Sequence, residues 1–252
     1  MPALGVDVGS TATKAVVVED GDIVATVVCP TGFSSVDAAE RAAALLRERG
    51  FDPEGMPCVA TGYGRVAVPY AQRVVTEITC HGRGAAFLFG SEGTVVDVGG
   101  QDTKVIVLRE GKVSKFAMND KCSAGTGKFL EVMANRLGVS QDELSRLARA
   151  GAPTRISSMC TVFAESEVIS LIGAGTPRED IARGVIESVV EKVCALASQG
   201  AGAPYFLTGG LCENGYIVKR MEARLRASVA TEPRARFAGA LGAALAAAED
   251  IR

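Results

Sequence analysis

Alternating runs of apolar and polar residues occur twice in this chain in the same order. Residues 6–23 (VDVGSTATKAVVVEDGDI) align without a gap with residues 96–113 (VDVGGQDTKVIVLREGKV), and eight of the 18 positions are identical. Each copy has an apolar strand that ends at an aspartate, a tight glycine turn, a second β-branched strand and another turn at Gly21 or Gly111. The pattern therefore predicts the same β-hairpin in two places, at a constant offset of 90 residues.

Segments with apolar residues at helical spacing come after each copy of the repeat. After the first copy, residues 34–50 combine a Ser34-x-x-Asp37 start, apolar positions on one helix face and a glycine at the C-terminal stop. After the second copy, the predicted helices are residues 125–138, 142–151, 161–175, 178–200, 222–229 and 239–250, with a strand at residues 205–210.

Two βα halves that share a duplicated hairpin predict an α/β fold of two similar lobes. We expect the first lobe to contain residues 1–92 plus 236–252 and the second lobe to contain residues 93–235. Small ligands usually bind in the cleft between the lobes of such proteins. The duplicated hairpins are therefore expected to face each other across that cleft.

The composition narrows the class of protein. Of the 252 residues, 48% are apolar and 22% are charged, which is typical of a folded globular chain. The 27 basic and 29 acidic side chains leave a net charge of -2, so neither nucleic acid nor a membrane is an expected partner. The sequence has no apolar run long enough to span a bilayer and no basic segment typical of a secretion signal, which favours a cytoplasmic protein.

The glycine turns of the two hairpins have the composition of phosphate-binding loops. In the first turn, Gly9 lets the backbone approach a ligand closely, while Ser10 and Thr11 add hydroxyls and successive N–H groups. Asp7 and Asp97 end the two central strands, and Mg²⁺ prefers one or two carboxylates together with substrate phosphates. A single turn of this kind is usually an ordinary β-turn. Its duplication, with both aspartates retained, favours the phosphate interpretation.

The second hairpin and a later strand supply the remaining candidates. Gln101 and Asp102 break the symmetry of the repeat. Gln101 is a candidate to orient an attacking water. Asp102 is a candidate to polarise that water or to hold Mg²⁺, with turn capping as the alternative. The predicted strand at residues 205–210 ends in paired glycines that suit a nucleoside lying against the backbone. The candidate catalytic residues are Gln101, Asp102, Asp7 and Asp97, and the candidate nucleotide-binding residues are Gly9, Ser10, Thr11, Lys14, Gly99, Gly100, Thr103, Lys104, Gly209 and Gly210, with the two lysines ranked below the aspartates.

Two phosphate hairpins followed by this glycine element resemble the actin, hexokinase and Hsp70 (ASKHA) superfamily. The resemblance covers nearly the whole chain. It implies two duplicated ribonuclease H-like lobes that clamp Mg²⁺ and ATP or ADP between their hairpins.

Two of the seven cysteines stand apart from the rest. The chain has no CxxC pair, which favours reduced thiols over a disulfide framework. Cys122, in NDKCSAGTGK, and Cys160, in MCTVFAE, each precede a predicted helix, and the partial positive charge of a helix N-terminus stabilises a thiolate. Two thiolates cannot complete a four-cysteine cluster, but a symmetric dimer supplies four. The alternative from the residues alone is that both cysteines are buried apolar fillers.

The strings NDKCSAGTGKFLEVMA and CTVFAESEVISL, together with VDVGGQDTK, TGYGR and ITCHGRGA, resemble the ATP-dependent activators of 2-hydroxyacyl-CoA dehydratases. That group also holds the ATPase subunits of benzoyl-CoA reductase. The resemblance implies a homodimer in which Cys122 and Cys160 of both chains bind one 4Fe-4S cluster. It further implies an electron donor, ferredoxin or flavodoxin, and ATP hydrolysis that drives the electron to a partner dehydratase.

Several alternatives stay open at this point. The first is an ATPase subunit of a benzoyl-CoA reductase, which would differ from a dehydratase activator in its partner. The second is a sugar or acetamido-sugar kinase, which would use Asn119-Asp120 as its catalytic base. The third is a nucleotide-binding scaffold, which would lack the cluster. Position argues against the kinase, because resemblance to such kinases implies a base between the two hairpins, whereas Asp120 follows the second hairpin. His81 is expected to be structural or a contact between the lobes, and the TGYGR loop to border the cleft or a partner. Residues 113–122 are expected to link the nucleotide to the cysteines.

Overall fold

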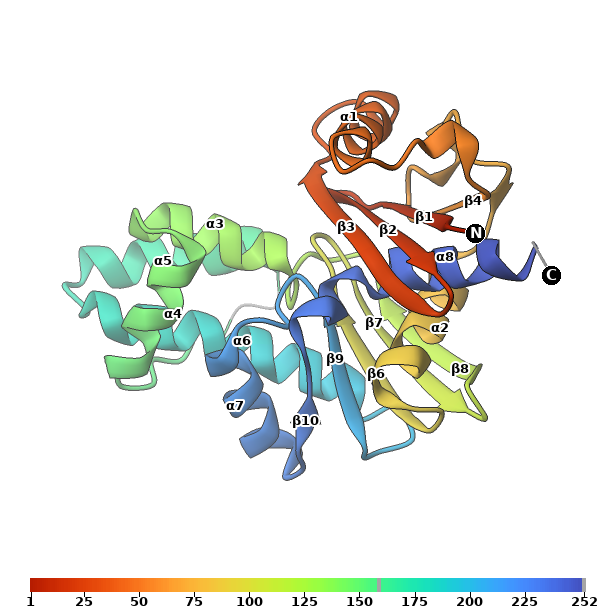
Figure 1. Cartoon of the computed structure of the whole chain (residues 1–252). Helices are drawn as coiled ribbons and strands as arrows, with labels where there is room; N and C mark the ends of the chain where they lie inside the picture. Colours follow the sequence, from red (N-terminus) through yellow and green to blue (C-terminus); the bar gives the residue numbers. More distant parts are fainter. Residues whose placement is uncertain (158–159, 251–252) are drawn as a thin grey trace.

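Each half of the chain contributes one five-stranded mixed sheet (Figure 1). The computed structural model describes residues 1–157 and 160–250. The strand order is β3-β2-β1-β4-β5 in the first sheet and β10-β9-β6-β7-β8 in the second. The strands are β1 (Ala3–Val8), β2 (Ala12–Glu19), β3 (Asp22–Pro30), β4 (Cys58–Thr61), β5 (Arg73–Val74), β6 (Gly93–Val98), β7 (Thr103–Arg109), β8 (Lys112–Asn119), β9 (Tyr205–Gly209) and β10 (Val229–Ala230).

The predicted duplication is confirmed in the backbone. The central strand of each sheet, β1 or β6, pairs antiparallel with its hairpin partner and parallel with a later strand, β4 or β9. The second hairpin strand of each lobe has an irregular register at the same place, after Val17 and after Val107. The turns that follow place Asp20 and Glu110 in the left-handed region, each before a glycine with positive φ. The two lobes therefore repeat their irregularities as well as their strands.

The helices are α1 (Ser35–Arg47), α2 (Glu77–Phe89), α3 (Gly127–Leu137), α4 (Gln141–Ala150), α5 (Thr161–Gly173), α6 (Arg178–Ala197), α7 (Gly215–Leu225) and α8 (Ala238–Glu249), with short 3₁₀ turns at Pro53–Gly55, Arg65–Ala67 and Pro233–Phe237. Helix α1 begins as predicted, because the Ser34 side chain accepts a hydrogen bond from the Asp37 N–H at 3.1 Å.

The prediction of a helix over residues 222–229 is wrong in its bounds. Helix α7 begins earlier, where Asn214 accepts hydrogen bonds from the N–H groups of Tyr216 and Ile217. It ends at Leu225, and the next residue, Arg226, has a φ of 53° in the left-handed region. Val229, which was expected to be helical, lies in β10 and pairs with β9.

Helices α2 and α8 lie between the two sheets (Figure 1). Helix α8 packs on β1, β2 and β4, while α2 packs on α8 and on β7 and β8. Their crossing is close because it is made by glycines: a Cβ added to Gly84 would lie 2.0 Å from the Ala238 carbonyl oxygen, and one added to Gly242 would lie 1.8 Å from that of Cys80. The two backbones therefore touch where the lobes meet.

The outer faces of the sheets are covered differently. Helix α1 closes the first sheet with an alanine-rich surface, whereas α3, α4 and α6 form the larger core against the second. The central strand of each sheet, β1 or β6, ends at the candidate functional site. The predicted division into residues 1–92 plus 236–252 and residues 93–235 stays a prediction.

Candidate functional site

Asp7 and Asp97 lie at equivalent points, near the ends of the two central strands, and both are buried. The neighbouring parallel strand places Thr61 opposite Asp7 and Thr208 opposite Asp97. Each threonine precedes a glycine with positive φ, and a Cβ on Gly209 would lie 2.9 Å from Asp97 Oδ1. The repeat therefore contains a third matching element, which the sequence analysis missed because its offset is not 90 residues.

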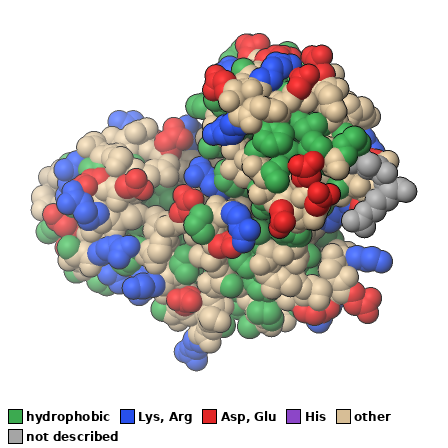
Figure 2. Space-filling model, in the orientation of Figure 1, with side chains coloured by type: hydrophobic (Ala, Val, Ile, Leu, Met, Phe, Trp, Pro, Cys, Tyr) green, Lys and Arg blue, Asp and Glu red, His purple; other side chains and the backbone are tan. Residues whose placement is uncertain are grey.

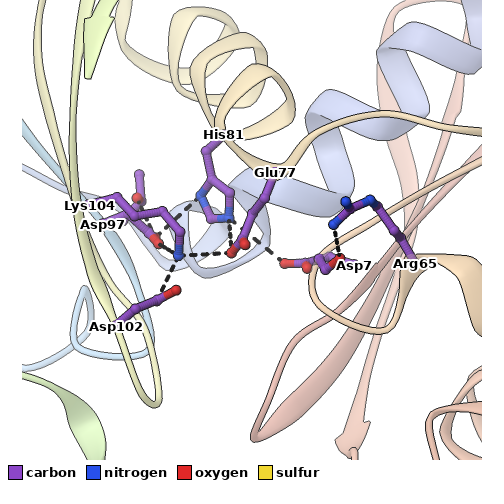
Figure 3. A network of polar contacts seen from close by, with 9 residues as sticks. Asp7, Arg65, Glu77, His81, Asp97, Asp102 and Lys104 are labelled. Atoms are coloured by element: carbon purple, nitrogen blue, oxygen red, sulfur yellow. Dashed lines mark hydrogen bonds and ion pairs between the residues drawn. The ribbon is translucent and has the colours of Figure 1, made fainter. Parts of the chain in front are cut away.

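Helix α2 brings His81 between the aspartates of the two lobes (Figure 3). His81 Nδ1 lies 3.3 Å from Asp97 Oδ1, and Nε2 lies 3.9 Å from Asp7 Oδ2 and 3.7 Å from Glu77 Oε1. The imidazole is 3% exposed. His81 thus contacts carboxylates of both central strands, in agreement with the second of the two expected roles, a structural residue or a contact between the lobes.

The network also contains a buried lysine. Lys104 Nζ donates a hydrogen bond to Asp102 Oδ1 at 2.6 Å and forms ion pairs with Glu77 at 2.9 Å and Asp97 at 3.7 Å (Figure 3). Lys104 is 1% exposed, so its charge is held inside the protein by three carboxylates. Its counterpart in the first hairpin, Lys14, is half-buried and lines the cleft instead.

Burial and the neighbouring charges shift the pKa values of the groups in this network. Burial lowers the pKa of His81, but Asp97, Glu77 and Asp7 outweigh it and raise that pKa above its usual value. Burial alone would raise the pKa of Asp97, but His81, Lys104 and Lys14 hold it well below its usual range. Burial raises the pKa of Glu77 despite the nearby cations. Asp97 is therefore the firmly ionised carboxylate of the site.

Both hairpins line one cleft of about 180 Å³. The cleft is small because the hairpins touch: a Cβ on Gly100 would lie 2.0 Å from Thr11 Oγ1. Ligand pockets usually measure about 300–1,000 Å³. A nucleotide would therefore have to separate the two hairpins. The predicted residues that line the cleft are Asp7, Gly9, Ser10, Thr11, Lys14, Asp97, Gly99, Gly100, Asp102, Gly209 and Gly210.

Three predicted residues of the second hairpin lie elsewhere. Gln101 is exposed and does not line the cleft. The buried hydroxyl of Thr103 donates to the Gly125 carbonyl at 2.8 Å, and Lys104 is enclosed by carboxylates. Thr103 and Lys104 therefore stabilise the framework of the site, whereas Gln101 lies outside the cleft.

The cleft also contains residues that the sequence analysis did not propose as site residues. They include Glu77, His81, Gly127, Lys128, Glu131, Gln141, Leu211 and Arg236, whereas Tyr63 of the cleft belongs to the TGYGR loop that was expected to border the cleft or a partner. Glu77 and His81 are four residues apart, so both project from one face of α2. That spacing was the available signal, but the segment was not predicted to be a helix.

The residues present fit a hydrated Mg²⁺. Asp7 Oδ1 and Asp102 Oδ2 are buried and have no hydrogen-bond partner among the described residues. Buried carboxylate oxygens of this kind are costly unless a proton or a cation satisfies them. The set of Asp7, Asp97 and Asp102 therefore offers oxygen ligands of the type that Mg²⁺ prefers.

The segments that carry Cys122 and Cys160 are joined directly. The hydroxyls of Ser123 and Thr161, the residues that follow the two cysteines, share a hydrogen bond of 2.9 Å. Cys160 is the N-cap residue of α5, whereas Cys122 comes directly before the turn that leads to Thr126, the N-cap residue of α3. The expected helix-start position thus holds for Cys160, and Cys122 lies further from its helix.

The other five cysteines differ from this pair. Burial raises the pKa of the Cys58 thiol to about 12, raises those of Cys80, Cys194 and Cys212 to about 11, and also raises that of Cys29. Cys122 and Cys160 are half-buried, and the described cysteines form no disulfide. The two expected cysteines are therefore the ones accessible to a shared group.

A hydrogen-bonded path runs from the second hairpin to Cys122. The Gly127 and Lys128 N–H groups, which begin α3, donate to the carbonyls of Gly99 and Gly100 at 3.0 and 2.8 Å. The Asn119 amide donates to the Cys122 carbonyl at 2.8 Å. Displacement of the glycine turn would therefore pull on the start of α3 and on the turn before it.

Two duplicated sheets, with aspartates at the ends of their central strands and glycine hairpins facing one cleft, define an actin-like ATPase fold, as the sequence analysis predicted. Within that class, the chain belongs to the BadF/BadG/BcrA/BcrD ATPase family, whose model matches residues 4–247.

Relatives with known roles are similar over almost their full length. The chain is 43% identical over 247 residues to the (R)-2-hydroxyglutaryl-CoA dehydratase activating ATPase of Acidaminococcus fermentans, with 96% of this chain and 95% of the relative covered. The crystal structure of component A of the dehydratase from that organism matches with a TM-score of 0.93 at 40% identity and full coverage of both chains. The activator of the 2-hydroxyisocaproyl-CoA dehydratase from Clostridium difficile with bound ADPNP matches with a TM-score of 0.90 at 38% identity, covering 99% of this chain and 95% of that one.

The distribution of charged side chains on the surface agrees with the nearly equal numbers of acidic and basic residues. Acidic and basic side chains are interspersed on the face shown in Figure 2. Within the described residues, no helix combines the length and the apolar character needed to cross a membrane.

Proposed function

We propose that this protein is an ATP-hydrolysing iron–sulfur activator that delivers one low-potential electron to a 2-hydroxyacyl-CoA dehydratase. The observation that carries the proposal is the 2.9 Å hydrogen bond between Ser123 and Thr161, which joins the two segments that carry Cys122 and Cys160. The relatives named as dehydratase activators support the choice of partner. Membership of their family also favours this function over the kinase and the scaffold.

Cys122 and Cys160 would hold the 4Fe-4S cluster, and such a cluster supplies one-electron chemistry. Each chain offers two thiolates, so the four ligands require a homodimer. Helix α5 supports this arrangement, because Cys160 is its N-cap residue and the helix leaves four large apolar side chains exposed. These are Val162, Phe163, Ile169 and Ile172. A second copy of the chain would cover them.

ATP would bind between the two hairpins. The backbone N–H groups of the Gly9 and Gly99 turns would receive the phosphates, and Lys14 would add a positive charge at the cleft. Asp7 and Asp97 would hold Mg²⁺, and Gly209 and Gly210 would seat the nucleoside.

The hydrolytic water would lie near Asp102, whose Oδ2 atom is buried without a described partner. Gln101 would join it only after the hairpin moves, because its side chain now lies outside the cleft. Asp102 therefore ranks first among the candidates for positioning the water.

The coupling of hydrolysis to electron transfer would use the path from Gly99 and Gly100 to the start of α3. Entry of the nucleotide separates the hairpins, and the carbonyls of the second turn carry the α3 N-terminus with them. This route complements the link predicted over residues 113–122, most of which form β8. The electron donor would be ferredoxin or flavodoxin in the cytoplasm.

The test is strictly anaerobic purification, followed by iron, sulfide and molar-mass determination. We expect one four-iron cluster per dimer, lost in Cys122→Ser and in Cys160→Ser. Cys194→Ser is the matched control, because Cys194 is buried in the core of the second lobe and should leave the iron content unchanged. An iron-free monomer that still binds ATP, in the wild type and in both cysteine variants, would overturn the proposal.

A further inference from the structure

We infer that a second cavity, at the far end of the two hairpins, is a regulatory site whose filling weakens nucleotide binding in the cleft. This cavity measures about 570 Å³, against about 180 Å³ for the cleft. Its size lies within the usual range of ligand pockets. The inference rests on nucleotide binding, which is part of the proposed function, and does not depend on the iron–sulfur cluster.

The cavity and the cleft lie at opposite ends of the same hairpins. Strand β2 begins at Ala12, which lines the cleft, and ends at Glu19, after which Asp20 lines the cavity. The eight residues of β2 span about 25 Å. Strand β7 likewise lies between Asp102 at the cleft and Glu110 at the cavity. Each copy of the repeat therefore reaches from one space to the other.

The two helices between the sheets also extend from the cleft to the cavity. Helix α2 places His81 at the cleft and Ala86 at the cavity. Helix α8 begins beside the cleft, where a Cβ on Gly239 would lie 2.7 Å from Asp7 Oδ2. Its later turns bring Leu245 to the cavity. The pair of helices thus lies between the two spaces.

Each of these helices belongs to a different sheet. Ala244 of α8 shares a core with Val16 of the first sheet, whereas Ala85 of α2 shares a core with Ile106 of the second. The two sheets are therefore joined through the crossing of α2 and α8, where the backbones touch at glycines. Packed bodies that meet at a narrow contact of this kind can rock about it without repacking their cores.

Rocking about the crossing changes the two spaces in opposite directions. A nucleotide has to separate the hairpins at the cleft, because a Cβ on Gly100 would lie 2.0 Å from Thr11 Oγ1. The opposite ends of the same hairpins then approach each other, and the cavity supplies the space for this movement. Whatever keeps the cavity open therefore opposes nucleotide binding, and by linkage the nucleotide opposes whatever fills the cavity.

The lining of the cavity indicates the class of ligand that would fill it. Its apolar side chains are buried or half-buried, and they are Val18, Ala86, Leu245 and Ala248. Its exposed charged side chains are Asp20, Glu110, Lys112 and Glu249. Arg83 of α2 pairs with Glu249 of α8 at 2.8 Å. A small amphipathic molecule, with an apolar body and a charged end, matches this lining.

The first experiment uses side chains of the protein itself to fill the cavity. Ala86→Phe and Ala248→Phe each add a ring there, and Ala223→Phe, on the exposed side of α7, is the matched control. The dissociation constant of ADPNP with Mg²⁺ is measured by calorimetry on the full chain. We expect it to rise at least about fivefold in both cavity variants, the lower end of usual coupling between sites, and to stay unchanged in the control. Unchanged affinity in the two cavity variants, shown to be folded by urea unfolding, would overturn the inference.

The second experiment follows the cavity directly. The chain has no tryptophan, so Leu245→Trp introduces a single emission probe at the cavity. We expect saturating ADPNP to shift its emission to shorter wavelength and to reduce quenching by acrylamide, because the cavity closes around the indole. Ala223→Trp, the control, should not respond.

The two experiments separate the inference from the proposed function. An indole at position 245 whose emission and quenching ADPNP leaves unchanged would overturn the inference, even if the phenylalanine variants fail to fold. Wild-type protein that binds no ADPNP would instead overturn the ATP-dependent part of the proposed function. Because both experiments work on iron-free protein, the absence of a cluster affects neither result.

Discussion

The hydroxyl oxygens of Ser123 and Thr161 lie 2.9 Å apart, although the two residues are 38 positions apart in the chain. This hydrogen bond joins a turn before α3 to the first residue of α5. Cys122 and Cys160 directly precede these two residues in the sequence. A contact between neighbouring side chains therefore joins the two segments that carry the cysteines.

Removal of this contact should loosen the cysteine pair. We expect Ser123→Ala and Thr161→Val each to cost about 1 kcal/mol of unfolding free energy and to speed the loss of iron to a chelator. The double variant should be little worse than either single variant, because one shared bond is removed in all three. The measurement is iron release followed by absorbance, together with urea unfolding. Fully additive effects would indicate that the hydroxyls act separately.

The glycine crossing of α2 and α8 should be intolerant of a methyl group. Gly84→Ala places a Cβ 2.0 Å from the Ala238 carbonyl oxygen, so we expect a loss of about 1–3 kcal/mol of stability despite the better helix propensity of alanine. Gly215→Ala in α7 meets no atom within 4 Å and should be neutral or stabilising. Urea unfolding of the two variants measures the contrast. Equal stabilities would mean that the helices separate at little cost.

Lys104 should be essential to stability, unlike its repeat partner Lys14. Lys104→Met leaves Glu77, Asp97 and Asp102 buried with less compensation, and we expect a loss of about 3–5 kcal/mol. Lys14→Met, at the cleft, should cost much less stability and should instead weaken ATP binding measured by calorimetry. Adding Glu77→Gln to Lys104→Met should recover part of the loss. The prediction fails if the two lysine variants unfold at the same urea concentration.

Stability should depend on pH through His81. Its pKa is raised in the folded protein, so protonation contributes stability that is fully present below about pH 6.5, the unfolded value. That contribution is lost as the pH rises through the folded pKa, by about 1.36 kcal/mol for each pKa unit of the shift. Urea unfolding in EDTA from pH 6 to 9 should show the decline in the wild type. His81→Asn should show a flatter profile, and an identical slope would assign the decline to other groups.

The sequence predicted the hairpins well because their chemistry is local. Gly21, Gly111 and the alternating strands leave a pattern that a single repeat search detects, and the Ser34 cap marks α1 for the same reason. Helix α2 was missed because Gly82 and Gly84 weaken helix propensity, and only the contact with α8 explains why glycine is present there.

The interior of the site could not be predicted from the sequence in the same way. Lys14 and Lys104 occupy identical places in the repeat, yet one lines the cleft and the other is buried. Part of the difference arises from Asp102, whose counterpart in the first hairpin is Ala12. The rest arises from Glu77 on α2, which is not part of the repeat and reaches Lys104 only in the folded chain. Sequence position fixes which residues belong to the hairpins, and tertiary packing decides which of them meet a ligand.

The position of α8 bears on how the chain folds during synthesis. About 230 residues separate the end of β1 from the start of the helix that packs on it. One face of the first sheet therefore stays uncovered while the whole second lobe emerges from the ribosome. Such long-range contacts slow folding and prolong the exposure of apolar surface. The lobe that is made first is completed last, and a chaperone would encounter it as an open sheet.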